Sequence, residues 1–122
     1  MKQGSTAPAA GGGQVVPFLR PPRVVIAYLQ NPRERFWGLV RALDGTGIVL
    51  QGVDLDSFDH WVRQVAEHGA AAAPSTVYFP LLRLEKVLID VAGDGVPSLA
   101  EQFERRVGKS LASFLGTGED QP

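Results

Sequence analysis

Cysteine is absent from this 122-residue sequence. Its absence excludes disulfide bonds, thiolate metal sites and a cysteine nucleophile, and it fits a reducing compartment. No apolar run approaches the ~20 residues that a membrane-spanning helix needs, and the residues after Lys2 lack the apolar core of a signal peptide. We therefore predict a soluble cytoplasmic protein with no membrane partner.

Histidine is scarce, with two residues in the whole chain. His60 and His68 stand two helical turns apart, too far to chelate one ion without a third ligand between them. No serine lies in a nucleophile-elbow pattern, so no catalytic triad can be assembled. We therefore predict no catalytic residue and no cofactor. A small enzyme that uses Asp54 and Asp56 as general bases stays as an alternative.

The densest polar cluster lies where an acidic segment meets a predicted helix. It consists of Asp54, Asp56, Asp59 and His60. Carboxylates and an imidazole can hold a divalent cation, but the cluster lacks the central glycine of a calcium loop. Asp56 can instead cap the helix, and Asp59 can interact favourably with its dipole. We predict that these residues start the helix, with a ligand role as the alternative, and we predict no metal site.

Basic and acidic residues are unevenly distributed along the chain. Residues 1–41 hold six basic residues and one acidic residue, whereas residues 42–94 hold eight acidic and three basic residues. Either the two segments are neighbours in the fold and neutralise each other, or a basic face binds nucleic acid, another anion or an acidic partner. Because aromatic and basic side chains together bind single strands, the second interpretation proposes a site. Its candidates are Arg33, Arg35, Trp37 and Arg41. In the first interpretation Trp37 belongs to the core or to a subunit interface.

The chain divides into a tail, one domain and a short end segment. Residues 1–14 are rich in Gly, Ala, Ser and Pro, which predicts a disordered tail. Residues 15–116 have the size of one domain, and residues 117–122 are predicted to fray. Runs of β-branched and aromatic residues predict the strands of this domain. The predicted strands are 24–29, 36–43, 48–53, 77–79 and 81–91, the last two as one or two strands.

The predicted fold class is α+β. Asp44-Gly45-Thr46-Gly47 is a hairpin signal, so the first three strands are expected to form an antiparallel meander. An apolar stripe at helical spacing predicts a helix from Ser57 to His68, and a capping box at Ser98–Glu101 predicts a C-terminal helical segment. We expect a strongly bent antiparallel sheet or partly open small β-barrel with these two helical additions. The stripe is Phe58, Trp61, Val62 and Val65.

Four segments within residues 23–91 together resemble the small barrels of the Sm-like and SH3-like classes. They are Phe36-Trp37-Gly38, Asp44-Gly45-Thr46-Gly47, Gly47-Ile48-Val49-Leu50 and Pro80-Leu81-Leu82-Arg83-Leu84-Glu85-Lys86-Val87. The resemblance implies a barrel fold, and Sm-like proteins form rings that bind single-stranded RNA. Asp44 is nearest to their RNA-binding aspartate, but the matching asparagine is missing and Arg83–Lys86 lacks glycine. No RNA-binding residue is therefore transferred to this chain.

The predicted function is a non-catalytic binding or assembly module that self-associates, with a homodimer favoured. The apolar run 81–91 predicts a strand buried on both faces, and Leu111, Phe114 and Leu115 add a second apolar patch. A chain this short is expected to cover one of them with a second copy. One alternative is that the C-terminal helix covers the strand within one chain. The other is a nucleic-acid-binding barrel that uses the basic N-terminal third.

Overall fold

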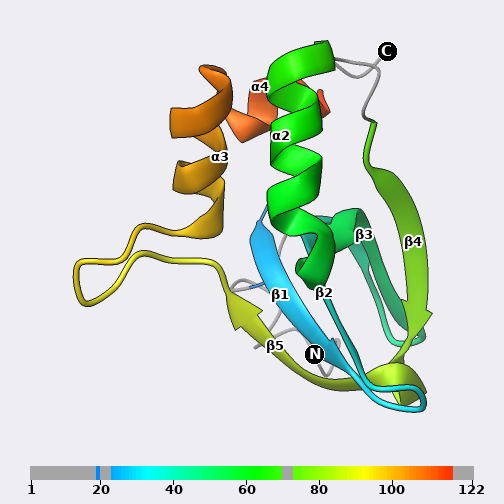
Figure 1. Cartoon of the computed structure of the whole chain (residues 1–122). Coiled ribbons are helices and arrows are strands. Elements are labelled where there is room, and N and C mark those ends of the chain that lie inside the picture. Colours follow the sequence, from blue (N-terminus) through cyan, green and yellow to red (C-terminus); the bar gives the residue numbers. More distant parts are fainter. Residues whose placement is uncertain (1–18, 20–22, 70–72, 117–122) are drawn as a thin grey trace, which may run out of the picture.

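The computed structural model describes residues 19, 23–69 and 73–116 (Figure 1). The predicted tail 1–14 and end segment 117–122 lie outside the described residues. Five antiparallel strands form one sheet in the order β4-β3-β2-β1-β5. The strands are β1 (Val24–Leu29), β2 (Glu34–Leu43), β3 (Gly47–Asp54), β4 (Ser75–Pro80) and β5 (Leu84–Ile89).

The described helical segments are η3 (Leu55–Ser57), α2 (Phe58–His68), η5 (Leu81–Arg83), α3 (Leu99–Val107) and α4 (Leu111–Leu115), of which η3 and η5 are short 3-10 turns. Helices α2, α3 and α4 lie together on one side of the sheet, whereas η5 joins β4 to β5 at its far end (Figure 1). The fold is therefore α+β, as predicted, with α2 inserted between β3 and β4 and with α3 and α4 at the C-terminal end. Among the described residues, no helix is long and apolar enough to cross a membrane.

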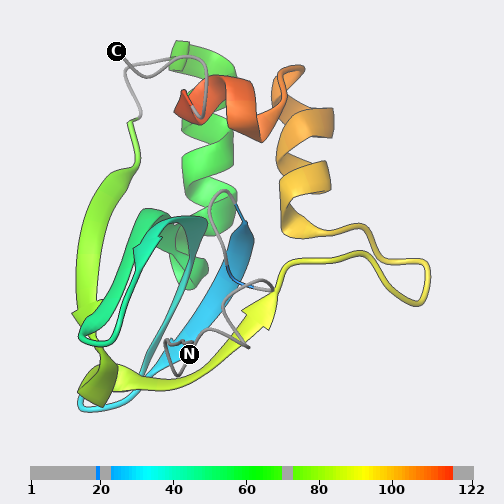
Figure 2. The ribbon, with the colours of Figure 1, turned by 180° about the vertical axis from the view of Figure 1, so that it is seen from behind.

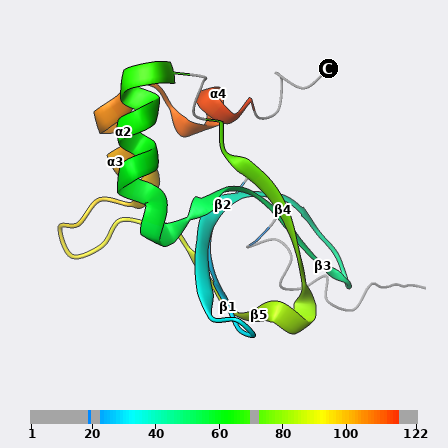
Figure 3. The same cartoon turned by 45° about the vertical axis from the view of Figure 1, so that its right-hand side comes forward.

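The sheet is strongly bent but is not closed into a barrel, and Figure 3 shows its strands curling around the inner face. Two glycines permit the closest approach of the central strands, because Gly38 lies directly opposite Gly52. A Cβ atom on Gly38 would lie 2.6 Å from the Gln51 carbonyl oxygen, and one on Gly52 would overlap the Trp37 backbone. Side chains at either position would therefore force β2 and β3 apart.

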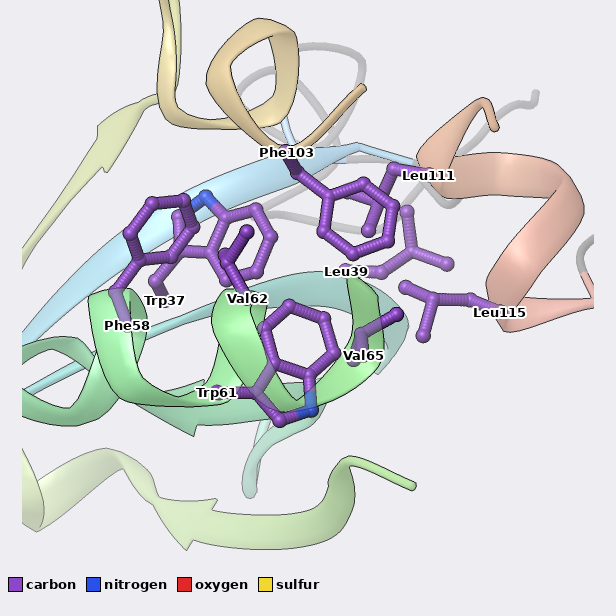
Figure 4. Close-up of a cluster of buried hydrophobic side chains, with 9 residues drawn as sticks. All are labelled: Trp37, Leu39, Phe58, Trp61, Val62, Val65, Phe103, Leu111 and Leu115. Atoms are coloured by element: carbon purple, nitrogen blue, oxygen red, sulfur yellow. The ribbon is translucent and has the colours of Figure 1, made fainter. Parts of the chain in front are cut away.

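Alternating residues of the strands build two separate cores. The odd-numbered residues of β1 face the inner side of the bent sheet, and Leu19 packs there as well. This inner core contains Val25, Ala27, Leu29, Phe36, Val40, Ile48, Leu50 and Phe79. The even-numbered residues of β1 face the helices and contact the second, helix-side core. That core contains Trp37, Leu39, Phe58, Trp61, Val62, Val65, Phe103, Leu111 and Leu115 (Figure 4).

Aromatic rings hold the helix-side core together. Trp61 stacks on Phe103 of α3, with ring centroids 5.2 Å apart, and its centroid lies 5.8 Å from that of Trp37. Phe58 meets Trp37 edge to face at 5.0 Å. The whole predicted stripe of α2 is buried, so the helical period in the sequence correctly identified the face that packs on the sheet.

The local signals at the helix ends are also confirmed. Ser98 and Glu101 form a reciprocal capping box at the start of α3, and Gly108 ends this helix in the left-handed conformation. Ser110 caps α4 by accepting a hydrogen bond from the Ser113 N–H. A second acceptor reaches the start of α3 from the sheet. The carboxylate of Asp90, just beyond β5, accepts hydrogen bonds from the N–H groups of Leu99 and Ala100 at 2.9 Å.

The prediction of a long strand buried on both faces over residues 81–91 is wrong. The chain turns through η5 after Pro80, so β5 begins only at Leu84. Leu82 is 86% exposed and Val91 is 67% exposed. The alternative, that the C-terminal helices cover this strand, fails too. Their apolar residues pack on the helix-side core over the central strands, which leaves Leu88 of β5 42% exposed.

Removal of the Trp61 side chain tests the helix-side core. We expect Trp61→Ala to lower the free energy of unfolding by about 3–5 kcal/mol, because loss of a large buried ring leaves a cavity. Urea denaturation followed by circular dichroism measures the change. Gln64→Ala, at an exposed position of the same helix, serves as control and is expected to change stability by less than about 0.5 kcal/mol. Equal midpoints for the two variants would contradict this packing of α2.

Candidate functional site

The four residues predicted to bind nucleic acid do not form one surface. Trp37 is buried in the helix-side core and is 1% exposed. Its indole Nε1–H donates a hydrogen bond to Asp90 Oδ2 at 3.1 Å. Both the ring and its polar edge are thus occupied within the chain, so Trp37 has no face free to stack on a base. Of its two predicted roles, the structure places it in the core.

Arg41 likewise has a structural role. Its Nε–H donates to Gln51 Oε1 at 2.8 Å, and its NH2 group donates to the Leu115 carbonyl oxygen at 3.0 Å. The side chain therefore joins the end of α4 to the sheet, where a cation favours the exposed carbonyls of a helix end. Six residues separate Arg41 from Arg35 along β2, which corresponds to roughly 20 Å in a strand. Among the described basic residues, Arg41 therefore lies apart from Arg33 and Arg35.

Arg33 and Arg35 lie beside a shallow depression of about 350 Å³ near the β1–β2 turn. Tyr28 of β1 lies at its base, and the Lys86 ammonium sits over the Tyr28 ring at 4.7 Å from the centroid. The charged groups around the depression are balanced, with three cations and three carboxylates. They are Arg33, Arg35 and Lys86, and Glu34, Asp56 and Glu85. This balance does not favour a polyanion.

Arg35 is itself engaged. Its NH2 group donates to Asp56 Oδ1 at 2.9 Å, and this hydrogen bond is the main reason that the pKa of Arg35 is raised above its usual value. Both side chains are largely in contact with solvent, so the pair adds little stability. It does reduce the positive charge that Arg35 can offer to a ligand. Arg33 lies in the exposed β1–β2 turn.

The polar cluster at the start of α2 is also occupied by contacts within the chain. Asp54 Oδ2 accepts a hydrogen bond from the Asp56 N–H at 3.1 Å and so caps η3. Asp56 pairs with Arg35, and Asp59 pairs with Arg106 of α3 at 2.9 Å. His60 is exposed on α2. The described residues include no group of three or more potential metal ligands. The predicted cap of α2 by Asp56 is wrong, because the residue at the start of α2 is Ser57, which makes no side-chain cap hydrogen bond, and Asp54 caps η3 instead. Asp59 does lie in the first turn of α2, as predicted.

Asp44, the residue nearest to the RNA-binding aspartate of Sm-like proteins, stabilises its own turn. Its Oδ1 atom accepts hydrogen bonds from the Thr46 N–H at 2.8 Å and from the Thr46 hydroxyl at 2.7 Å. A weaker contact comes from the Gly47 N–H at 3.3 Å. These donors, chiefly the Thr46 N–H, lower the pKa of Asp44 because they stabilise the carboxylate.

Sequence reasoning missed the partners of Arg83. Its guanidinium donates to the Gln30 and Pro32 carbonyl oxygens at 2.7 and 3.2 Å and pairs with Glu34 at 2.6 Å. It therefore fixes the β1–β2 turn, including its cis Asn31–Pro32 bond, against η5. The sequence showed only a polar residue within an apolar run. No local pattern indicates a partner about fifty residues away.

Exposed apolar residues also lie at β5 and in the hairpin that follows it. Residues 90–98 project from between β5 and α3, away from the rest of the structure (Figures 1 and 2). Asp94 and Gly95 both have positive φ at its tip, and Gly93 pairs with Val96. These two residues form the tight turn that reverses the chain between Gly93 and Val96. We call the exposed residues here the β5 surface. They are Leu88, Val91 and Val96, which are 42%, 67% and 60% exposed.

The β5 surface adjoins a free strand edge. Within the described residues, β5 pairs with β1 alone. The Asp90 N–H donates to the Val24 carbonyl at 3.0 Å. Since hydrogen bonding alternates along an antiparallel ladder, Lys86 and Leu88 also bond toward β1. The N–H and C=O groups of Val87 and Ile89 consequently point to the free side.

The opposite edge of the sheet is blunted. The Leu81 N–H donates to the Thr46 carbonyl at 3.0 Å, so Phe79 and Val77 of β4 bond toward β3. Thr76, Tyr78 and Pro80 then face the free side. Proline has no N–H to donate, and Pro80 therefore weakens the β4 edge as a template for another strand. Of the two sheet edges in the described part of the chain, β5 is therefore better suited than β4 to accept another strand.

Substitution of the two exposed arginines tests for nucleic-acid binding. We expect weak binding of single-stranded RNA or DNA, and we expect Arg33→Glu with Arg35→Glu to change it little, because the surrounding charges are balanced. Fluorescence anisotropy at two salt concentrations measures the affinity. Arg63→Glu, at an exposed arginine of α2, is the control. Tight binding with a steep salt dependence, lost in the double variant and kept in the control, would restore the nucleic-acid interpretation.

The lowered pKa of Asp44 gives a pH dependence of known sign. The ionised carboxylate contributes stability at pH values above the usual aspartate range, and this contribution is lost as pH falls through the lower pKa of the folded state. We expect the Asp44 carboxyl to titrate below its usual value by NMR. Thr46→Val removes the hydroxyl donor and keeps the N–H, so it should return the pKa part of the way. An ordinary pKa for Asp44 in the folded protein would contradict the observed turn.

No protein family model matches the chain, and neither a curated protein nor a solved structure is similar to it. The resemblance to Sm-like and SH3-like barrels therefore stays a prediction from the sequence. Function has to be inferred from the chain itself, and the β5 surface beside an unpaired strand edge is a feature that the contacts among the described residues do not account for.

Proposed function

We propose that this protein is a non-catalytic assembly module that works by self-association. The observation that carries the proposal is the exposed apolar β5 surface beside an unpaired strand edge. A sheet edge with outward N–H and C=O groups is a template for another strand, and monomeric proteins usually blunt such edges. Leu88, Val91 and Val96 would lose contact with water if this region met a second chain, and that loss is favourable.

A non-catalytic role is supported by the hydrogen bonds and ion pairs that the candidate carboxylates already make within the chain. Asp54, Asp56 and Asp59, the carboxylates that an enzyme would use here, each hold a cap or an ion pair. A general base needs a carboxylate free to receive a proton from a substrate in a recess. The contacts of these residues instead stabilise the start of α2 and join it to β2 and α3.

Self-association is expected to appear as a rise in mass with concentration. Sedimentation velocity or light scattering from low to high micromolar protein concentrations measures it, and we expect a shift from the mass of one chain to twice that mass. Because the interaction is proposed to be largely apolar, moderate salt should leave the dimer in place. A constant single-chain mass over the whole range would refute the proposal.

A further inference from the structure

We propose that two copies of the chain associate through their β5 edges, antiparallel across a two-fold axis at Leu88, so that the sheet continues from one subunit into the other. This inference rests on the proposed self-association and specifies its surface and register. It commits to a second copy as the occupant of the edge. The free backbone groups, the exposed side chains and the charges of β5 each support it.

The backbone of β5 is suited to pair with itself. Val87 and Ile89 direct their N–H and C=O groups away from β1, as the Asp90 to Val24 hydrogen bond and the strand register show. With the axis at Leu88, Val87 lies opposite the partner's Ile89, and Ile89 opposite the partner's Val87. Each of these pairs can exchange both of its N–H···O bonds. Leu88 then meets the partner's Leu88 in the closer, non-hydrogen-bonded type of pair.

The charges select this register. Lys86, Leu88 and Asp90 alternate along the chain and so lie on the same face of the sheet. With the axis at Leu88, Lys86 lies directly opposite the partner's Asp90, and the symmetric pair forms on the other side. The Asp90 carboxylate also accepts the hydrogen bonds from Trp37, Leu99 and Ala100, so it takes part in this contact as a charge that is already fixed in place. Opposite charges across neighbouring strands are favourable, whereas like charges are unfavourable. A shift of the axis by one residue in either direction moves both ion pairs out of line.

The same row of side chains explains why a second copy fits better than an unrelated strand. A basic residue, an apolar residue and an acidic residue follow each other, and this order is complementary to itself when reversed. Leu88, 42% exposed in one chain, would contact its own counterpart at the axis. Lys86 lies over the Tyr28 ring of the neighbouring strand β1, so its ammonium has to turn toward the free edge to reach the partner's Asp90. The net charge of −1 per chain puts little repulsion between two copies.

A single introduced cysteine tests the register directly, since the natural sequence has none. In a non-hydrogen-bonded antiparallel pair the Cα atoms lie about 4.5 Å apart, which is within the range that a disulfide spans. We expect Leu88→Cys to form a disulfide-linked dimer under mild oxidation, seen on a non-reducing gel. Leu82→Cys is the matched control, because Leu82 is more exposed but lies outside β5. It is expected to cross-link at least about tenfold more slowly.

A second variant tests the contact without oxidation. Leu88→Lys places two like charges face to face at the axis, and we expect it to raise the dimer dissociation constant by about tenfold or more, while Leu82→Lys leaves it unchanged. Circular dichroism and urea midpoints check that both variants fold. Because Leu88 is already partly exposed, its replacement is expected to leave the monomer folded.

The outcomes separate this inference from the proposed function. If the natural chain dimerises but Leu88→Cys cross-links no faster than Leu82→Cys, or Leu88→Lys dimerises as the natural chain does, the β5 register is wrong and self-association stands. If the natural chain stays a monomer at all concentrations, both proposals fail. Cross-linking at Leu88 together with weaker association of Leu88→Lys supports both.

Discussion

The hydrogen bond from the buried Trp37 indole to Asp90 is the contact on which the arrangement of the layers depends. A donor that is removed from water in a core costs free energy unless it finds an acceptor, so Trp37 can occupy the helix-side core only with Asp90 in place. The same carboxylate accepts from the first N–H groups of α3. One side chain thus joins the central strand β2, the end of β5 and the start of α3. It fixes where the helical layer begins.

This constraint also accounts for the exposed β5 surface. With its start held at Asp90, α3 directs Phe103 onto Trp61, and α4 follows with Leu111 and Leu115 on the same core. The buried apolar residues of α3 and α4 therefore pack over the central strands, and these helices do not cover Leu88. The sequence suggested that either these helices or a second chain would cover the apolar run after Pro80. The anchor at Asp90 removes the first option for Leu88.

The parts of the fold that the sequence predicted are those with local signals. The first three strand runs, the Asp44–Gly47 hairpin, the α2 stripe and the capping box all depend on residues close together in the sequence, and the structure contains each of them. The contacts of Trp37, Arg41 and Arg83 could not be predicted, because each joins segments that lie far apart in the sequence. No periodicity or spacing encodes such pairs. For that reason a buried tryptophan and a helix-capping arginine resembled a nucleic-acid site when only their neighbours along the chain were considered.

Contacts between residues far apart in the sequence also explain part of the uneven distribution of charge along the chain. Arg35 of the basic N-terminal third pairs with Asp56 of the acidic middle, and Glu34 pairs with Arg83, so the two segments meet and neutralise each other in part. Such exposed pairs add little to the stability of the fold, but the pair with Asp56 reduces the positive charge that Arg35 can offer to a nucleic acid. Lys86 and Asp90 are disposed differently. They lie on one face at the edge of the sheet, and among the described residues no ion pair joins them within one chain, although Asp90 accepts three hydrogen bonds and Lys86 lies over Tyr28. Because a short strand and a few apolar side chains bury less than a standard interface, the contact they specify is expected to be weak. Its formation would then follow the protein concentration, which suits an assembly module that has to form and separate readily.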